Sequence, residues 1–172
     1  HNYSSEQTFT VQVQDMDEGT APTLGDGSEE NPYQIDTLAH LKWLSFTESV
    51  WNQNKHFIQT SDINASETKN WANGYGFRPI GPNSGDFKGN YDGHGFQIRN
   101  LFIYRPSESR PAGLFSSVHH SDLKNIRMLD ANITGSGKTG GLVGIANQNT
   151  VIENCSFDGT ILGGGDVGGL VG

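Results

Sequence analysis

The residues that could do chemistry in this chain are mainly carboxylates of its second half. Hydrolysis of a polysaccharide needs an acid and a base grouped on one face of the fold. Six aspartates are candidates for such a group: Asp86, Asp92, Asp122, Asp130, Asp158 and Asp166. They are scattered along the chain and form no compact catalytic motif. An enzyme and a non-catalytic segment therefore both stay open as interpretations.

Asp130 and Asp158 are the pair whose spacing favours a shared site. Their separation along the chain, 158 − 130 = 28, equals the repeat interval described below, so they could stack on one face. Two carboxylates about 4.8 Å apart would raise the pKa of one of them or attract a cation. The alternative interpretation is a pair of exposed turn carboxylates.

Histidine and cysteine give weaker indications. His119 and His120 precede Asp122 in a pattern that suggests a metal, but adjacent residues of a strand point to opposite faces and cannot chelate well. Cys155 is the only cysteine, so an internal disulfide is excluded. No base is fixed beside its thiol by the sequence, which favours a small core residue.

A repeat organises the region that carries these groups. Gly-Leu-apolar triplets begin at Gly113, Gly141 and Gly169, and the two intervals are equal, since 141 − 113 = 28 and 169 − 141 = 28. A fixed period of this size is typical of repeat architectures. Each unit holds short apolar segments separated by turn residues, and none is long enough for a helix. We expect each coil to span one such interval, and successive coils to stack about 4.8 Å apart through parallel strand pairing.

Stacked coils assign side chains to shared positions. Gly-Leu triplets predict one inward stack, and the pattern apolar-charged-Asn-apolar at 98–101, 123–126 and 152–155 predicts two more, with a ladder of asparagines at a turn. The expected sets are Leu114 with Leu142 and Leu170; Ile98 with Leu123 and Ile152; Leu101 with Ile126 and Cys155; and Asn100 with Asn125 and Asn154.

One amphipathic helix is predicted at 37–47, with Asp36 as its N-cap. Its leucines share one face, and His40 falls on the exposed side. The first coil of a stack exposes apolar side chains and unpaired backbone, so we interpret this helix as an N-terminal cap. No cap follows the last repeat, and further coils or another molecule are expected to cover the end at Gly172.

The N-terminal region predicts a separate strand. Residues 8–14 alternate apolar and polar side chains, and a Gly/Asp/Ser/Pro connector at 23–32 marks a domain boundary. The expected organisation is a terminal strand and acidic linker at 1–22, a connector, capping helix and first irregular coil at 23–97, and repeat coils at 98–172 that are incomplete at the C-terminus.

Composition excludes several classes of partner. The net charge is −8 and the 11 Lys and Arg residues form no cluster, which disfavours nucleic acid and anionic membrane surfaces. Hydrophobic residues are 33% of the chain and glycines number 23, which fits many turns around a thin core. The chain holds no apolar run long enough to span a bilayer as a helix, so no membrane insertion is expected.

The repeated Gly-Leu-Val-Gly at 141–144 and 169–172 resembles the GLUG motif. The preceding residues agree in order with the module that often comes before that motif, at 31–35, 61–63, 79–81 and 87–95, so the resemblance covers roughly residues 24–172. The first copy departs from it, because Ser116 replaces the final glycine. The resemblance implies a mainly β fold, a right-handed parallel β-helix, in large secreted or surface-attached bacterial proteins, including adhesins. It implies no fixed activity.

Residues 8–22 resemble the last strand and linker of bacterial cadherin-like repeats. In that family an acidic linker helps to hold calcium between consecutive domains. The resemblance makes Asp15, Asp17 and Glu18 candidate ligands and Ca2+ a candidate cofactor. Calcium takes six to eight oxygen ligands, so three carboxylates would need others from elsewhere. A solvated acidic linker is the alternative.

Two functions are consistent with these patterns. The first is a non-catalytic structural or adhesive segment of a secreted or cell-surface bacterial adhesin, whose loops at 65–76 and 104–111 meet a glycan or protein ligand. Neighbouring domains or other subunits would then cover the open end. The second is an accessory or catalytic module of a polysaccharide-active enzyme. We expect the first, without enzymatic activity, at an extracellular or cell-surface location.

Overall fold

The computed structural model describes residues 17–51, 54–82 and 85–172. The strand predicted at 8–14 lies outside the described residues. The described part is mainly β, with one α-helix, α1 (Leu38–Phe46), and three short 3-10 helices, η1 (Glu48–Val50), η2 (Ser66–Asn70) and η3 (Ala72–Gly74). Among these residues, no helix combines the length and the apolar composition needed to cross a membrane.

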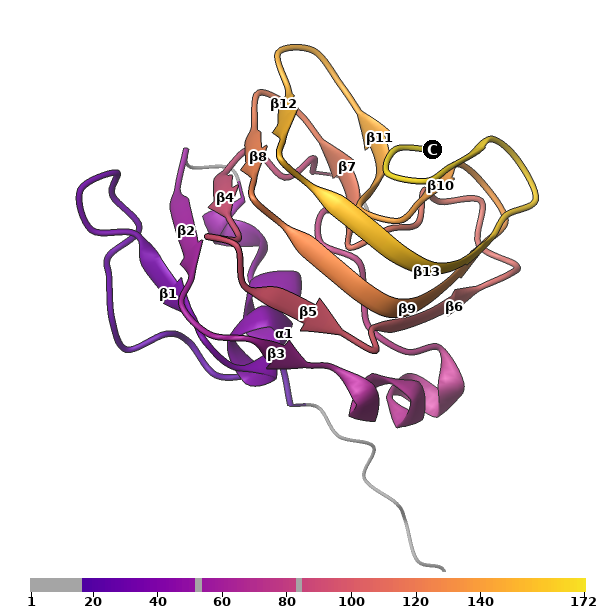
Figure 1. The fold of residues 1–172 in the computed structure, drawn as a ribbon, viewed down its shortest axis with the longest axis horizontal. Helices are drawn as coiled ribbons and strands as arrows, with labels where there is room; N and C mark the ends of the chain where they lie inside the picture. Colours follow the sequence, from indigo (N-terminus) through magenta and orange to yellow (C-terminus); the bar gives the residue numbers. More distant parts are fainter. Residues whose placement is uncertain (1–16, 52–53, 83–84) are drawn as a thin grey trace, which may run out of the picture.

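Parallel pairing joins strands from successive passes of the chain. One sheet has the order β1 (Tyr33–Ile35), β2 (His56–Gln59), β4 (Asn90–Asp92), β8 (Asp122–Lys124) and β12 (Val151–Glu153). A second has the order β3 (Ile63–Asn64), β5 (Gln97–Arg99), β9 (Arg127–Gly135) and β13 (Ser156–Leu162), and β6 (Phe102–Arg105) also pairs with β9. Two-stranded sheets join β7 (Phe115–Val118) to β11 (Val143–Ala146) and β10 (Thr139–Gly140) to β14 (Val167–Gly168). Figure 1 shows these sheets curling around a common interior.

The register of β7 and β11 reproduces the repeat. Phe115 pairs with Val143, and Val143 with Val171, so both pairings keep the interval of the Gly-Leu triplets. The leucine that precedes each of these residues points to the core: Leu114 and Leu142 are buried, and Leu170 packs against the cluster. The predicted leucine stack is confirmed.

The predicted stack of Ile98 with Leu123 and Ile152 is wrong in one member. Leu123 does pair with Ile152, in the first sheet, but its neighbour on the other side is Tyr91. Ile98 lies in the second sheet and pairs with Met128. The same sequence pattern occurs at two different corners of the chain, and only the pairing register separates them.

The stack of Leu101 with Ile126 and Cys155 fails for the same reason. The residue after Leu101, Phe102, pairs with Asn132, which aligns Leu101 with Ala131. Ile126 and Cys155 do share a position, because the residues that follow them, Arg127 and Ser156, are paired.

The asparagines that were predicted to form one ladder are divided between two ladders in the structure. Asn125 donates from Nδ2 to Asp92 Oδ1 at 2.9 Å and accepts from Asn154 Nδ2 at 3.4 Å. Asn100 belongs to the other corner, where its Nδ2 donates to Asn64 Oδ1 at 3.2 Å. All three asparagines of the prediction have φ between 52° and 59°. Asn is suited to this left-handed backbone because its short side chain can bond locally.

Helix α1 packs its leucines into the core at the β1 and β3 end of the sheets (Figure 1). Its N-cap is Thr37 and not Asp36, because the Thr37 hydroxyl accepts from the His40 N–H at 3.2 Å. Asp36 instead lies 2.8 Å from His40 Nδ1. This contact folds the imidazole onto the helix, and the His40 side chain is only 15% exposed, so its predicted exposure is wrong.

Aromatic rings fill the space between α1 and the strands that the chain forms first. Phe87 lies between Phe57 and Phe115, with ring centres 5.8 and 5.0 Å away, and Tyr91 packs edge-on to Phe115 at 5.9 Å. The buried Trp51 donates from its indole to the Leu44 carbonyl at 2.7 Å.

Candidate ligand-binding pocket

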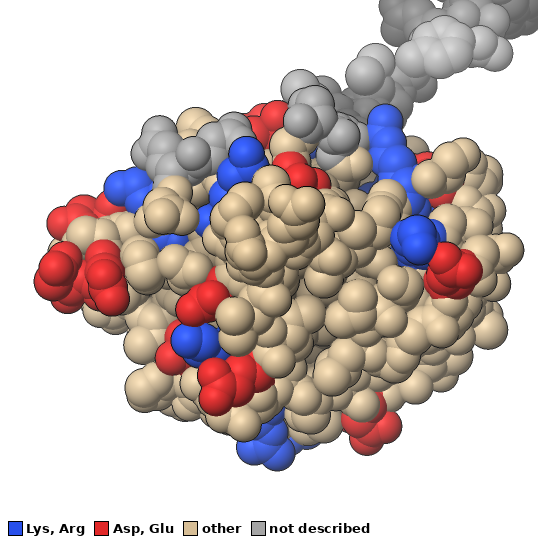
Figure 2. Space-filling model, turned by 90° about the horizontal axis from the view of Figure 1, so that it is seen from above, with Lys and Arg blue, Asp and Glu red and all other residues tan. Residues whose placement is uncertain are grey.

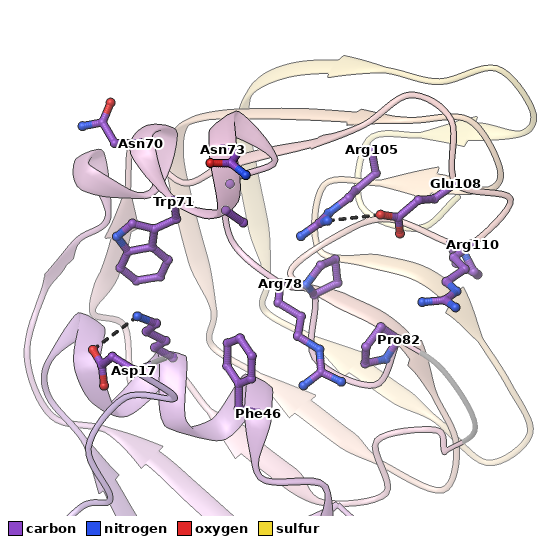
Figure 3. A pocket seen from close by; sticks show the side chains of 15 residues that line it. Asp17, Phe46, Asn70, Trp71, Asn73, Arg78, Pro82, Arg105, Glu108 and Arg110 are labelled. Atoms are coloured by element: carbon purple, nitrogen blue, oxygen red, sulfur yellow. Dashed lines mark hydrogen bonds and ion pairs between the residues drawn. The ribbon is translucent and has the colours of Figure 1, made fainter. Parts of the chain in front are cut away.

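A pocket of about 490 Å3 lies between the C-terminal half of α1, residues 70–82 and the loop that follows β6. Figure 3 shows its side chains converging from Asp17, from α1, from residues 70–82 and from residues 105–111. This volume is within the range of small-ligand sites. The two loops predicted to meet a ligand, 65–76 and 104–111, both contribute to its wall.

Backbone pairing brings these two loops together. The Phe77 N–H donates to the Phe102 carbonyl at 2.8 Å, and the Tyr104 N–H donates to the Tyr75 carbonyl at 2.9 Å. Between them Gly76 adopts φ +78°, and a Cβ on it would lie 2.3 Å from the Phe102 oxygen. Only glycine fits this close crossing. The crossing fixes residues 70–82 beside the loop that follows β6.

The pocket rim contains a left-handed turn. Ala72, Asn73 and Gly74 have φ values of 48°, 56° and 87°. Such a conformation is costly for alanine, and strained backbone of this kind concentrates at functional sites. The Trp71 carbonyl holds the turn by accepting from the N–H groups of Gly74 at 3.0 Å and Gly76 at 3.1 Å. The turn presents Trp71 and Asn73 at the pocket (Figure 3).

Asp17 places one predicted metal ligand at the edge of this pocket. Its carboxylate accepts from the Gly19 N–H at 2.9 Å and from Lys42 Nζ at 3.3 Å, and these hydrogen bonds lower its pKa. Glu18 is exposed, and Asp15 lies outside the described residues. Within the described part of the chain, no three or more His, Cys, Asp or Glu side chains group to hold a metal. The calcium site stays a prediction.

Two cations lie against aromatic rings in the pocket. Lys42 Nζ is 4.6 Å from the centre of the Trp71 ring, and Arg78 Cζ is 4.9 Å from that of Phe46. Arg78 also bonds Glu48 Oε1 at 2.9 Å. These contacts hold the two rings and the two cations in fixed positions.

The opposite wall carries two more arginines. Arg105 bonds Glu108 Oε1 at 3.1 Å and lies 5.3 Å from the Tyr75 ring. Arg110 is exposed, and its guanidinium has no acidic partner among the residues that the structure describes. Four cations thus meet three paired carboxylates, those of Asp17, Glu48 and Glu108. Among the described residues, Arg110 is the one cation of these four that has no carboxylate partner.

The sequence did not indicate these cations. Arg78 is far from the other two along the chain, and four residues that include Glu108 separate Arg105 from Arg110, so no basic cluster is visible in the sequence. The available signal was the loop at 65–76, which is rich in Trp, Tyr, Asn and Gly. Charged side chains elsewhere are mixed in sign, and on the face shown in Figure 2 Lys and Arg lie interspersed with Asp and Glu.

The structure brings Asp130 and Asp158 to the same corner of the second sheet. Met128 pairs with Phe157 and Ala131 with Gly159, so the two aspartates lie beside the intervening irregularity of β9 and β13. Both side chains are exposed. The two aspartates are thus near each other in the sheet but are not paired directly, and their shared face and a catalytic or cation-binding role stay predictions.

The other predicted aspartates have structural partners. Asp86 accepts from Ser117 Oγ at 2.6 Å, and Asp92 accepts at its corner from the His94 N–H at 2.7 Å. Two ion pairs complete the set, Asp122 with Lys124 at 3.0 Å and Asp166 with Lys138 at 2.7 Å.

His119 and His120 do not point to opposite faces. They follow β7 in a bend, where His120 has φ 53°, and their ring centres are 4.1 Å apart. The strand geometry assumed in the prediction does not extend to them. His119 Nδ1 is 3.8 Å from Asp86, and His120 Nε2 is 2.9 Å from Asn149 Nδ2. Neither contact forms a group of three metal-binding side chains.

Cys155 is half-buried and packs against the core, as its small apolar character indicated. Burial raises the pKa of its thiol, which disfavours the reactive thiolate. No catalytic base contacts it in the described residues.

Comparison with known proteins gives two relatives. The chain is 35% identical over 136 residues to halomucin from Haloquadratum walsbyi, which covers 78% of the chain and 1% of that protein. It is 34% identical over 137 residues to a protein named as a Gly-rich membrane protein from Evansella cellulosilytica, which covers 78% of the chain and 15% of that protein. The chain thus spans a small part of either relative. No solved structure matches it.

Residues 135–162 match the family described as the GLUG motif. The match contains the Gly-Leu-Val-Gly copy at 141–144, whose leucine is the middle member of the buried stack. The upstream resemblance to cadherin-like repeats stays a prediction. Residues 135–162 therefore carry a match to the GLUG motif, as the sequence predicted for its Gly-Leu-Val-Gly repeats.

Proposed function

We propose that the chain is a non-catalytic segment of a large surface protein, which presents the pocket beside α1 to an extracellular glycan or protein ligand. The observation that carries this proposal is the convergence of both predicted loops on one pocket, which combines aromatic rings with Arg110, a cation without an acidic partner among the described residues. Binding sites commonly combine apolar walls with a few placed polar groups in this way.

The scaffold in this proposal is a right-handed parallel β-helix with α1 as its cap. Supporting it, every pairing between named strands is parallel, and each sheet adds one strand from each later pass of the chain. Parallel strands joined by a crossover connection are right-handed in nearly all proteins. A cap is needed at the end of such a stack, and the buried leucines of α1 occupy that place.

The surface location rests on the relatives and on charge. The names of the two relatives, a halomucin and a Gly-rich membrane protein, favour a place at the cell boundary. The net charge of −8 is compatible with an extracellular or high-salt setting. Because the chain covers so little of either relative, the activity and partners of the whole protein belong to this proposal.

A non-catalytic role is favoured by the state of the carboxylates in the pocket. A general acid near neutral pH needs a raised pKa. The pKa of Asp17 is instead lowered, by the Gly19 N–H and by Lys42, and Glu108 is bonded to Arg105. If the chain is an enzyme, its remaining candidate catalytic residues are Asp130 and Asp158, which lie at one corner of the sheet formed by β9 and β13.

A binding screen tests the proposal. The chain is labelled with 15N and titrated with panels of neutral glycans, acidic glycans and peptides, while the same panels are assayed for cleavage. We expect shift changes at residues 70–78 and 105–111, loss of these changes in Trp71→Ala, and no turnover. Binding confined to other surfaces would overturn the pocket as the site. Turnover that disappears in Asp130→Asn would favour the enzyme.

A further inference from the structure

We infer that the last layer of the stack, residues 147–172 with β12, β13 and β14, is a docking surface for a further parallel β-layer that carries Lys or Arg opposite Glu153 and Asp166. The occupant is a coil of the same repeat type, and not the last layer of a second copy of this chain. This surface lies apart from the pocket beside α1, since the described residues that line that pocket all lie between Asp17 and Pro111.

The strands of the last layer lie at sheet edges. β12, β13 and β14 each end the strand order of their sheet, and each pairs in parallel with one strand of the layer below. Within the described part of the chain, the backbone groups on the other side of these strands have no strand partner. Such an edge accepts a further strand through main-chain hydrogen bonds.

Apolar side chains of the last layer are exposed at positions that are buried one layer below. Thr139 is buried, whereas Val167, which pairs with it, is 50% exposed. Val143 is fully buried, whereas its partner Val171 is 37% exposed. A further layer about 4.8 Å away would cover these positions of the last layer, as the last layer covers those of the middle layer, residues 119–146.

The contacts between the middle and last layers set cations against carboxylates. Lys138 Nζ lies 2.7 Å from Asp166 Oδ2, and Lys124 pairs in register with Glu153. Residues 119–146 supply both lysines, while residues 147–172 contain three carboxylates and no Lys or Arg. The last layer therefore complements the layer below it, and a layer that complements it on the open side carries cations.

One column of the first sheet alternates in charge over three layers. Lys124 pairs in register with Asp92 on one side and with Glu153 on the other. The salt bridge with Asp122, together with the charges of Glu153 and Asp92, raises the pKa of Lys124 and so favours its charged form. A cation opposite Glu153 in the next layer continues this alternation. A second copy docked by its own last layer would instead set carboxylates against carboxylates, which is unfavourable.

Two extended chains test the inference. In each, a copy of residues 145–172 follows Gly172 as one further coil, with Ala in place of the copied Cys155. The acidic extension keeps the copied Glu153 and Asp166, and the cationic extension has Lys in both places. The measurement is the rate at which iodoacetamide modifies Cys155 of the original chain. This thiol is half-buried, while Ile126 at the same position one layer below is fully buried, so a docked layer is expected to protect it.

We expect the cationic extension to slow the modification of Cys155 about tenfold or more relative to the unextended chain, and the acidic extension to slow it clearly less. The difference should shrink at about 1 M salt, because salt screens exposed charges. Equal protection by both extensions, or a difference that salt leaves unchanged, would overturn the preference for cations. An unchanged rate with the cationic extension would overturn the docking surface itself.

Sedimentation of the unextended chain is an independent test that does not depend on the folding of an added coil. We expect a monomer at both low and high salt, because the last layers of two copies repel each other. A dimer in which Cys155 is protected from iodoacetamide would overturn the inference, since a second copy would then be the occupant. Both experiments leave the pocket beside α1 untouched, so neither result bears on the proposed function.

Discussion

The middle and last layers of the repeat have the same kinds of residue in very different surroundings. Leu142 is 1% exposed, while Leu170, one repeat later, is only partly buried. Met128 is fully buried, and its neighbour Phe157 on β13 is not. Each apolar position becomes core only when a layer lies on both sides of it. Burial in this fold is therefore a property of the stack and not of a single repeat.

The two ends of the stack differ in the same sense. At the first end α1 covers the layer, and two leucines of this helix, Leu41 and Leu44, are fully buried against it. In the last layer several large apolar side chains are exposed: Val151, Leu162, Val167 and Val171. The repeat sequence thus specifies which side chains point inward. How far these side chains are buried depends on whether another layer or a helix packs on each side of their own layer.

The largest expected effect is a difference in the free energy of unfolding between two leucine-to-alanine variants, one in the middle layer and one in the last layer. Leu142→Ala should lower the free energy of unfolding by about 2–5 kcal/mol, because it leaves a cavity between two layers. Leu170→Ala removes the same atoms from a partly exposed site, and should cost about half as much or less. Urea denaturation of both variants measures the difference. Equal losses would break the comparison, since they would mean that the last layer is packed as tightly as the middle one.

A smaller effect is expected at the asparagine ladder. Asn125 bonds residues in the layers on both sides, Asp92 and Asn154, whereas Asn154 bonds only Asn125 in the described residues. Asn125→Ala should destabilise the fold by about 1–3 kcal/mol, through lost hydrogen bonds and a left-handed φ that alanine resists. Asn125→Gly should recover the backbone part. Thermal unfolding of these variants and of Asn154→Ala tests the order, and a greater loss for Asn154→Ala would contradict it.

The smallest effect concerns the pH response of the last layer. Burial raises the pKa of the Cys155 thiol in the fold. Its contribution to stability is thus fully present below the unfolded-state pKa of about 8.5, and is lost as the pH rises through the folded-state value. We expect the pH profile of alkylation by iodoacetamide to have its midpoint above that of a free cysteine. Cys155→Ala should remove the corresponding decline of stability at alkaline pH. A midpoint at or below the free value would show that the last layer is fully open to water.

Several features could be predicted from local patterns. The leucine stack followed from the constant interval between the Gly-Leu triplets, and the buried face of α1 followed from the spacing of its leucines. The two loops named as ligand-facing do line one pocket. Each of these depends on residues close in sequence or on an interval that is kept constant.

Other features could not be predicted because two distant corners look alike in sequence. The patterns at 98–101 and 123–126 are similar, yet one belongs to the β5–β9 ladder and the other to the β4–β8 ladder. The first Gly-Leu copy is a further example. Ser116 is buried there and donates from its hydroxyl to the Pro111 carbonyl at 2.8 Å, while a Cβ at Gly144, in the second copy, would lie 2.5 Å from the Pro111 Cβ. Adjacent layers therefore demand different residues at one repeat position.

The amino-acid pattern was enough to specify the repeat, its inward leucines and the helix that packs on its first end. Those features follow from regular spacings of apolar residues along the chain, and such spacings can be read from the sequence without knowing which segments pair. The register of the corners, the pairing of Asp36 with His40, and the pocket that unites Trp71, Arg78 and Arg110 emerged only in three dimensions. The physical reason is that these contacts join segments from different passes of the chain, or depend on competition between neighbouring hydrogen-bond donors and acceptors. Their geometry is set by the stacking of whole layers and by the glycine crossing at Gly76.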